Sequence, residues 1–171
     1  MNDGSNALIL HLVKLEKNKD RGALAALRKG LGKPPGSVPE MFEHVVPYVE
    51  INASIAQEDA AFLVASLFAS YPEGSGHGDM GVTFRTIRAA TGSESIEGRF
   101  IALLKCRRED LPDHLRHAVA LARSKSATVD WSQLLFDIVN WDDWSGSIQR
   151  RWAKSFWELS IKMEPEKNSE E

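Results

Sequence analysis

The sequence has few of the residues that cross-link small folds or anchor them in membranes. Cys106 is the only cysteine among 171 residues, which excludes an internal disulfide and a cysteine-rich zinc site. The chain has no uninterrupted apolar run of about 18 residues, the length needed to cross a membrane, and no N-terminal secretory signal. We therefore expect a cytoplasmic protein with no membrane partner.

Motifs of the common catalytic classes are also missing. Gly32-Lys33 looks like the end of a phosphate-binding P-loop, but Leu27 stands where the first glycine is needed and Pro34 where Ser or Thr is needed. No serine lies in a G-x-S-x-G elbow. Cys106 has cationic neighbours that would lower a thiol pKa, but a half-buried helix cysteine is the favoured interpretation. We expect no enzymatic activity and no cofactor.

One short segment offers possible metal ligands, namely Asp110, Asp113, His114 and His117. The two imidazoles are three residues apart on a predicted helix and could reach one side of an ion. The chain has no HExxH motif, second histidine pair or cysteine cluster to complete such a site. Solvent-facing helix residues without metal are the favoured interpretation, and a metal-dependent hydrolase remains an alternative.

Cations are absent from one long stretch and concentrated in others, within a formal net charge of −3. Residues 34–84 contain seven acids and no Lys or Arg. Residues 14–33 contain seven cations against two acids, and residues 85–125 contain nine against five. Such blocks predict faces of opposite potential, and a positive face suits a nucleic-acid backbone. Ordinary solvated helix faces are the more usual explanation of charge runs in general.

Apolar residues recur at helical spacing along nearly the whole chain, and alternating strand-like runs bounded by turns are missing. The sequence therefore predicts an all-α protein. Asp20, Asp110 and Asp130 stand where helix N-caps are expected. The expected helices begin near residues 6, 21, 39, 57, 82, 95, 111, 131 and 145. We expect the second helix to end at Leu31 and the last at Lys162.

Glycine is concentrated in residues 72–81, PEGSGHGDMG, a composition typical of a loop. We expect this segment to be a flexible connection between two small helical bundles, formed by residues 1–71 and 82–162. Residues 163–171 would then form an acidic, disordered tail.

The predicted helices display cations on their exposed sides. Arg21 and Arg28 are seven residues apart, as are Arg116 and Arg123, so each pair shares one helix face. Arginine pairs well with phosphate oxygens, and no element suggests base reading, so we expect backbone binding without sequence specificity. The candidate nucleic-acid-binding residues are Arg21, Arg28, Lys29, Lys33, Arg99, Lys105, Arg107, Arg108, Arg116 and Arg123.

Four stretches, taken in order, resemble the small subunit of the type I-E CRISPR Cascade complex, the CasB family. They are GALAALRKGLG, RFIALLKCRREDLPDHLRHAVALARS, VDWSQLLFDIVNWDD and RRWAKSFW, and together they extend from Gly22 to Trp157. The resemblance implies an all-helical, non-enzymatic protein with two small bundles, present as two copies lying head to tail in the complex. Its implied partners are the guide-carrying backbone subunits, the large subunit, the guide RNA and the target DNA.

The resemblance also implies what the cations do. The family's basic surface helps to hold the target strand and the displaced strand of the R-loop, and the candidate residues in the matching stretches would contribute backbone contacts. Arg150 and Arg151 match the family's basic run before its last aromatic helix, where they would contact DNA or another subunit. Because the whole chain is slightly acidic, we expect weak binding by the isolated protein and avidity in the complex.

A stand-alone DNA-binding regulator is the alternative function. Residues 82–107 can form a helix-turn-helix, with Thr91-Gly92 supplying the turn. That interpretation predicts tight binding to a preferred palindromic site without partner subunits.

Overall fold

The computed structural model describes residues 3–158 and confirms an all-α fold. Within that range the chain forms nine α-helices and four short 3₁₀ helices, with one isolated bridge between Ser75 and Val129 in place of strands. The α-helices are α1 (Asp3–Lys17), α2 (Arg21–Arg28), α3 (Phe42–Val45), α4 (Ile55–Ser70), α5 (Met80–Thr91), α6 (Ser95–Lys105), α7 (Leu111–Ser124), α8 (Trp131–Val139) and α9 (Ser147–Trp157). The 3₁₀ helices are η1 (Pro39–Met41), η2 (Val46–Tyr48), η3 (Pro72–Gly74) and η4 (Arg108–Asp110).

Short polar side chains set several helix starts. Asp20 accepts a hydrogen bond from the backbone N–H of Ala23 at 3.0 Å, and Asp130 accepts one from that of Gln133 at 3.0 Å, as predicted. Asp110 makes no such bond, so its predicted capping role is wrong. The reason is that Asp110 is the last residue of η4 and has helical backbone angles, φ −92° and ψ −13°, instead of the extended conformation of a capping residue.

Two predicted helix ends also differ from the structure. Helix α2 ends at Arg28, and the chain continues to Leu31 in tight turns whose N–H groups bond three residues back. Gly32, with a φ of 71°, then takes the left-handed conformation that a helix stop requires. At the other end of the chain α9 ends at Trp157 rather than Lys162, and the predicted acidic tail, residues 163–171, lies outside the described residues.

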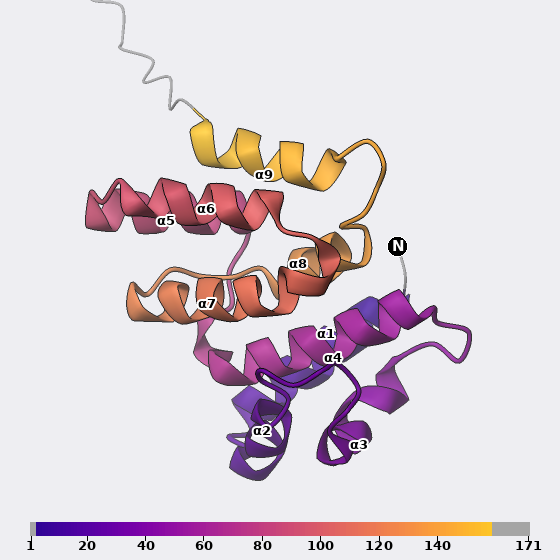
Figure 1. Cartoon of the computed structure of the whole chain (residues 1–171). Coiled ribbons are helices and arrows are strands. Elements are labelled where there is room, and N and C mark those ends of the chain that lie inside the picture. The colour runs from indigo at the N-terminus through magenta and orange to yellow at the C-terminus, as the bar shows by residue number, and fades with distance from the viewer. Residues whose placement is uncertain (1–2, 159–171) are drawn as a thin grey trace, which may run out of the picture.

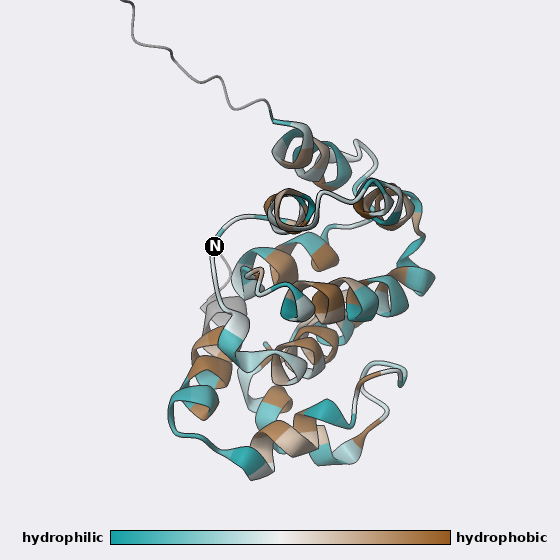
Figure 2. Ribbon diagram, turned by 90° about the vertical axis from the view of Figure 1, so that its left-hand side faces the viewer, coloured by the Kyte–Doolittle hydropathy of each residue, from teal (hydrophilic) through white to brown (hydrophobic). Residues whose placement is uncertain are grey.

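Helix α4 lies at the centre of the fold, with nine of its sixteen residues buried. Figure 1 shows the helices stacked in successive layers, with α9 at one end, α2 and α3 at the other, and α4 below α7 and α8. Figure 2 shows hydrophobic and hydrophilic residues alternating along the helices, as expected for helices with one buried side. None of the described helices is long and apolar enough to span a membrane.

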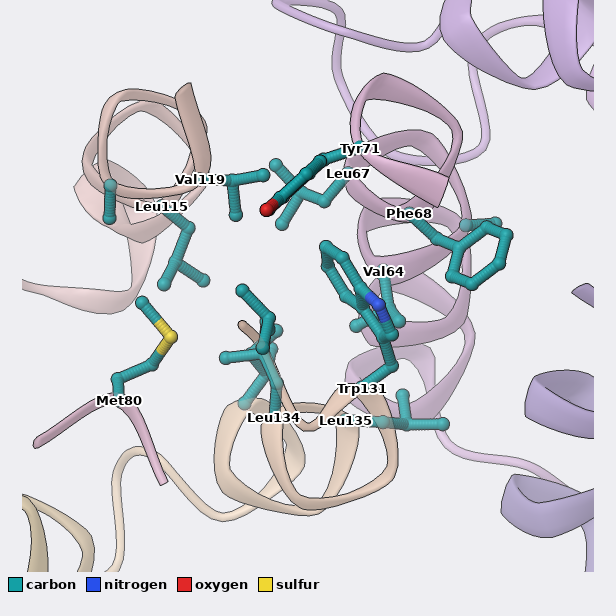
Figure 3. Close-up of a cluster of buried hydrophobic side chains, with 14 of the residues drawn as sticks. Val64, Leu67, Phe68, Tyr71, Met80, Leu115, Val119, Trp131, Leu134 and Leu135 are labelled. Carbon is teal, nitrogen blue, oxygen red and sulfur yellow. The ribbon is translucent and has the colours of Figure 1, made fainter. Parts of the chain in front are cut away.

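The buried side chains form one cluster that includes both halves of the chain. Figure 3 shows Phe68 of the N-terminal half beside Trp131 of α8, and Tyr71 pointing towards Val119 of α7. The ring centroids of Phe68 and Trp131 lie 5.5 Å apart in an edge-on arrangement. The predicted division into two bundles stays a prediction, and the apolar core continues across it.

The glycine-rich segment that we expected to be flexible is held by the rest of the fold. The N–H of Gly76 donates to the carbonyl of Val129 at 2.9 Å, and the N–H of Val129 donates to the carbonyl of Gly74 at 2.8 Å. A Cβ on Gly76 would overlap the Thr128 hydroxyl, so glycine is needed for this close approach. Hydrogen bonds thus join this segment to residues far away in the sequence, and its flexibility stays a prediction.

A buried polar network joins α5, α8 and α9. Both carboxylate oxygens of Asp137 accept hydrogen bonds, one from Gln133 and Arg151 and the other from the Trp152 indole at 2.6 Å. Burial raises the pKa of the Asp137 carboxyl, and these hydrogen bonds oppose that rise. Arg151 also reaches Asp79, the N-cap of α5, at 3.5 Å. Arg151 therefore stabilises the fold from within this network.

Candidate nucleic-acid interface

Helix α7 presents two of the predicted arginines on its outer side. Leu115, Val119 and Ala122 are buried against the core, whereas Arg116 and Arg123 are exposed. Pro112 stands in the first turn, where its fixed φ favours the helix and its missing N–H does no harm. The predicted seven-residue spacing therefore places both guanidinium groups on one face of a regular helix.

The turn that follows α2 lies against the same face of α7. A groove of about 320 Å³ separates residues 30–35 from the start of α7 and is lined by Lys33 and Arg116, with Asp113 and Glu109 also contributing. A second groove, of about 480 Å³, is lined by Arg116 and Arg123 together with Leu31. Because Arg116 lines both, the two grooves are neighbours. We call the surface formed by Lys33, Arg116 and Arg123 the α7 face.

The hydrogen bonds on the α7 face use only part of each guanidinium group. One nitrogen of Arg116 donates to Asp113 at 3.1 Å, and one nitrogen of Arg123 donates to the backbone carbonyl of Ser70 at 3.2 Å. A guanidinium has five N–H groups, so these contacts hold the side chains in place and leave other N–H donors of two exposed residues available. Arg116 also lies 3.8 Å from the position of a Cβ on Gly32, which brings the α2 turn close to it.

A third groove, of about 560 Å³, lies on the other side of α7, towards α6. Arg99 of α6 lines it together with His114 and His117 of α7. Ala120 lines both this groove and the one beside Arg123, so the two open on either side of the same stretch of α7. The sequence favoured solvent-facing positions for the two histidines, with metal binding as the alternative, and did not predict this groove, since only the packing of α6 on α7 creates it.

The other predicted cations of the N-terminal half line neither groove of the α7 face. Lys29 makes an exposed ion pair with Glu40 at 3.1 Å, as Arg116 does with Asp113, but on a different part of the surface. Arg28 is exposed, and its Nε donates to the backbone carbonyl of Leu24 at 3.2 Å. Arg21 is exposed at the first residue of α2, at the opposite end of that helix from Arg28.

The predicted cations at the end of α6 and directly after it fall into two groups. Lys105 and Arg107 are exposed. Arg108 is half-buried, pairs with Asp142 and donates to the backbone carbonyl of Val139 at 3.2 Å. Arg108 therefore fastens η4 to the end of α8, so its substitution would disturb packing as well as charge.

The thiol beside these cations is not activated. Burial, followed by the charge of Asp110, raises the pKa of Cys106 to about 11. The neighbouring cations, which the sequence suggested would lower this pKa, do not overcome the effect of burial. Within residues 3–158, no group of three or more His, Cys, Asp or Glu side chains is placed to hold a metal ion.

Comparison with known proteins agrees with the fold and with the sequence resemblance. The profile of the CRISPR-associated protein Cse2 family matches residues 23–157. A Cse2 protein of Thermus thermophilus is 34% identical over 154 residues, which cover 87% of this chain and 86% of that protein. The crystal structure of a Cse2-family protein from Thermus thermophilus matches with a TM-score of 0.79 and 31% identity, covering 93% of this chain and 100% of that one. A chain of a CRISPR RNA-guided surveillance complex matches with a TM-score of 0.77 and 26% identity, covering 90% of this chain and 91% of that one. The chain therefore belongs to the CRISPR-associated protein Cse2 family.

Proposed function

We propose that this chain is a structural, non-enzymatic subunit of a CRISPR RNA-guided surveillance complex of the Cascade type, and that it holds DNA strands of the R-loop by their phosphate backbone. Membership of the Cse2 family supports the first part, as does the similarity to a chain of such a complex. The arrangement of the α7 face supports the second.

The observation that carries the proposal is the convergence of cations from two distant segments. Lys33 follows α2, whereas Arg116 and Arg123 belong to α7, and adjoining grooves place all three on one surface. Arginine forks suit phosphate oxygens, which are spaced regularly along any strand whatever its sequence. A surface of this kind binds backbone and reads no bases.

Modest binding of this kind is enough for the function. Exchange of a DNA duplex for a guide–target heteroduplex is nearly balanced in free energy, so a few protein contacts to the backbone shift it. With a net charge of −3, the free chain is a weak binder. Assembly with the backbone and large subunits, the guide RNA and a second copy of the chain would supply the necessary effective concentration.

Exposed apolar residues lie away from the α7 face and suit contacts with those other subunits. Ile51 and Ile55, before and at the start of α4, are 99% and 78% exposed, and Trp144 before α9 is 96% exposed. Aromatic and aliphatic residues of this kind are frequent anchors at protein interfaces.

The test is a charge reversal in the assembled complex. Arg116→Glu with Arg123→Glu removes two phosphate contacts, and we expect target-DNA affinity to fall at least about 25-fold at 0.1 M salt. The control is Lys17→Glu with Lys154→Glu, which makes the same change in charge at two exposed residues outside these grooves. Equal losses in both variants would overturn the proposal. So would tight binding of one preferred duplex sequence by the free chain, which would indicate a regulator.

A further inference from the structure

The groove between α6 and α7 combines an apolar floor with a cationic rim. Phe84, Leu103 and Ala118 form the floor and are nearly fully buried, with exposed fractions of 2%, 1% and 4%. The Phe84 ring is held against Phe100, with the centroids 5.1 Å apart. The polar residues that line the groove are Arg99, His114 and His117, and no acidic residue lines it.

This composition selects a particular chemistry of ligand. An apolar floor favours a flat, poorly hydrated group, and the Arg99 guanidinium and the imidazoles offer N–H donors but no negative charge. A ligand that is aromatic at one end and anionic at the other satisfies both parts, as a nucleotide does. An aliphatic segment of a partner protein would satisfy the floor and leave the rim without a counter-charge.

The position of the groove indicates where such a nucleotide would come from. Ala120 lines this groove and also the groove that contains Arg116 and Arg123. A strand that crosses α7 at Ala120 from the α7 face therefore reaches the α6–α7 groove. Bases of a single strand are available for stacking on histidine and aromatic side chains, whereas bases of a duplex are not.

We propose that the α6–α7 groove takes up an unstacked base of a single DNA strand held on the α7 face, with His114 and His117 against the base and Arg99 at a neighbouring phosphate. This inference rests on the proposed backbone binding and adds a second mode of contact to it. Every base has a flat face, so the groove binds single strands in preference to duplexes without selecting sequence.

The test compares a thymidine oligonucleotide with an abasic strand of the same length, both titrated into the full-length chain. Wild type should bind the thymidine strand about tenfold more tightly than the abasic strand. Ala102→Leu, on the exposed lining of the groove, should reduce this ratio towards one and leave abasic binding unchanged. Ala90→Leu, exposed on α5 and outside the groove, is the matched control and should retain the ratio. His117→Ala tests the same point without adding volume, and we expect it to lower the ratio too.

The outcomes separate this inference from the proposed function. Arg116→Glu with Arg123→Glu should weaken binding of both strands and preserve their ratio. Equal wild-type affinities for the two strands, both dependent on the α7 face, would overturn the base-binding groove and leave backbone binding intact. Thymidine monophosphate that competes as well as the strand would overturn it in favour of a small-molecule site. Loss of the Ala102→Leu chain from the assembled complex, with strand binding unchanged, would overturn it in favour of a protein segment.

Discussion

Replacing Asp137 by asparagine should destabilise the junction of α5, α8 and α9 strongly. Asp137 is fully buried, and its two oxygens accept from donors on opposite sides, Arg151 and Gln133 on one and Trp152 on the other. An asparagine offers one oxygen and one NH₂ group in place of the two carboxylate oxygens. In either orientation its NH₂ group therefore faces an N–H donor of a neighbouring side chain. The less costly orientation leaves the buried Trp152 indole N–H without an acceptor.

The expected magnitude follows from these contacts. An orphaned buried N–H costs about 1–3 kcal/mol, and loss of a charge-assisted bond costs about 1.5–3 kcal/mol. The Arg151 side chain is 39% exposed and keeps Asp79 at 3.5 Å, so the second cost is at its lower limit. We expect a total loss of about 3 kcal/mol in the free energy of unfolding. For a chain of this size that lowers the midpoint of thermal unfolding by about 6–12 °C.

Thermal and urea unfolding, followed by circular dichroism of the full-length chain, would measure the effect. The control is Asp142→Asn, which also removes an arginine's carboxylate partner, but at a side chain that is 61% exposed. An exposed pair of that kind contributes about 0.5 kcal/mol. Similar losses in the two variants would refute the reasoning, because burial and the opposed donors would then not determine the cost.

Two further predictions concern the other perturbed side chains. Because the pKa of Cys106 is raised to about 11, iodoacetamide at pH 8 should modify its thiol about 100-fold more slowly in the native chain than in the urea-unfolded chain. Similar modification rates in the native and unfolded chains would contradict the burial of this thiol. His11 stacks on Tyr48, with centroids 4.1 Å apart, and burial, His44 and Lys14 lower its pKa. As the pH falls below about 6.5, the histidine therefore takes up a proton more readily in the unfolded chain than in the folded chain, and the folded chain loses stability. The urea midpoint should fall less between pH 7 and pH 5 in His11→Phe than in wild type. An equal fall in the two proteins would exclude His11 as the cause.

Local physical chemistry is sufficient to predict the fold class and much of the helix pattern from the sequence. Helical spacing of apolar residues identifies α7, a long apolar run identifies α4, and short acids such as Asp20 and Asp130 mark helix starts, because these effects act within a few residues. The same periodicity correctly places Arg116 and Arg123 outside and Leu115 inside.

Features that depend on contacts between distant residues were not predictable in this way. The hydrogen bonds between residues 72–81 and Val129 join segments about 50 residues apart. The sequence alone does not show which arginines form ion pairs within the protein, whereas the folded chain pairs Arg108 with Asp142 and Arg151 with Asp137. At Cys106 the sequence shows nearby charges, and burial, which the sequence does not show, dominates the pKa.

The salt dependence of target-DNA affinity in the assembled complex tests the central claim most directly. If Arg116 and Arg123 each contact one phosphate of a single strand, their reversal to Glu should make the slope of log affinity against log salt shallower by about 1.4. The control reversal of Lys17 and Lys154 should leave the slope unchanged. Parallel plots for wild type and the Arg116→Glu, Arg123→Glu complex would contradict phosphate binding by the α7 face.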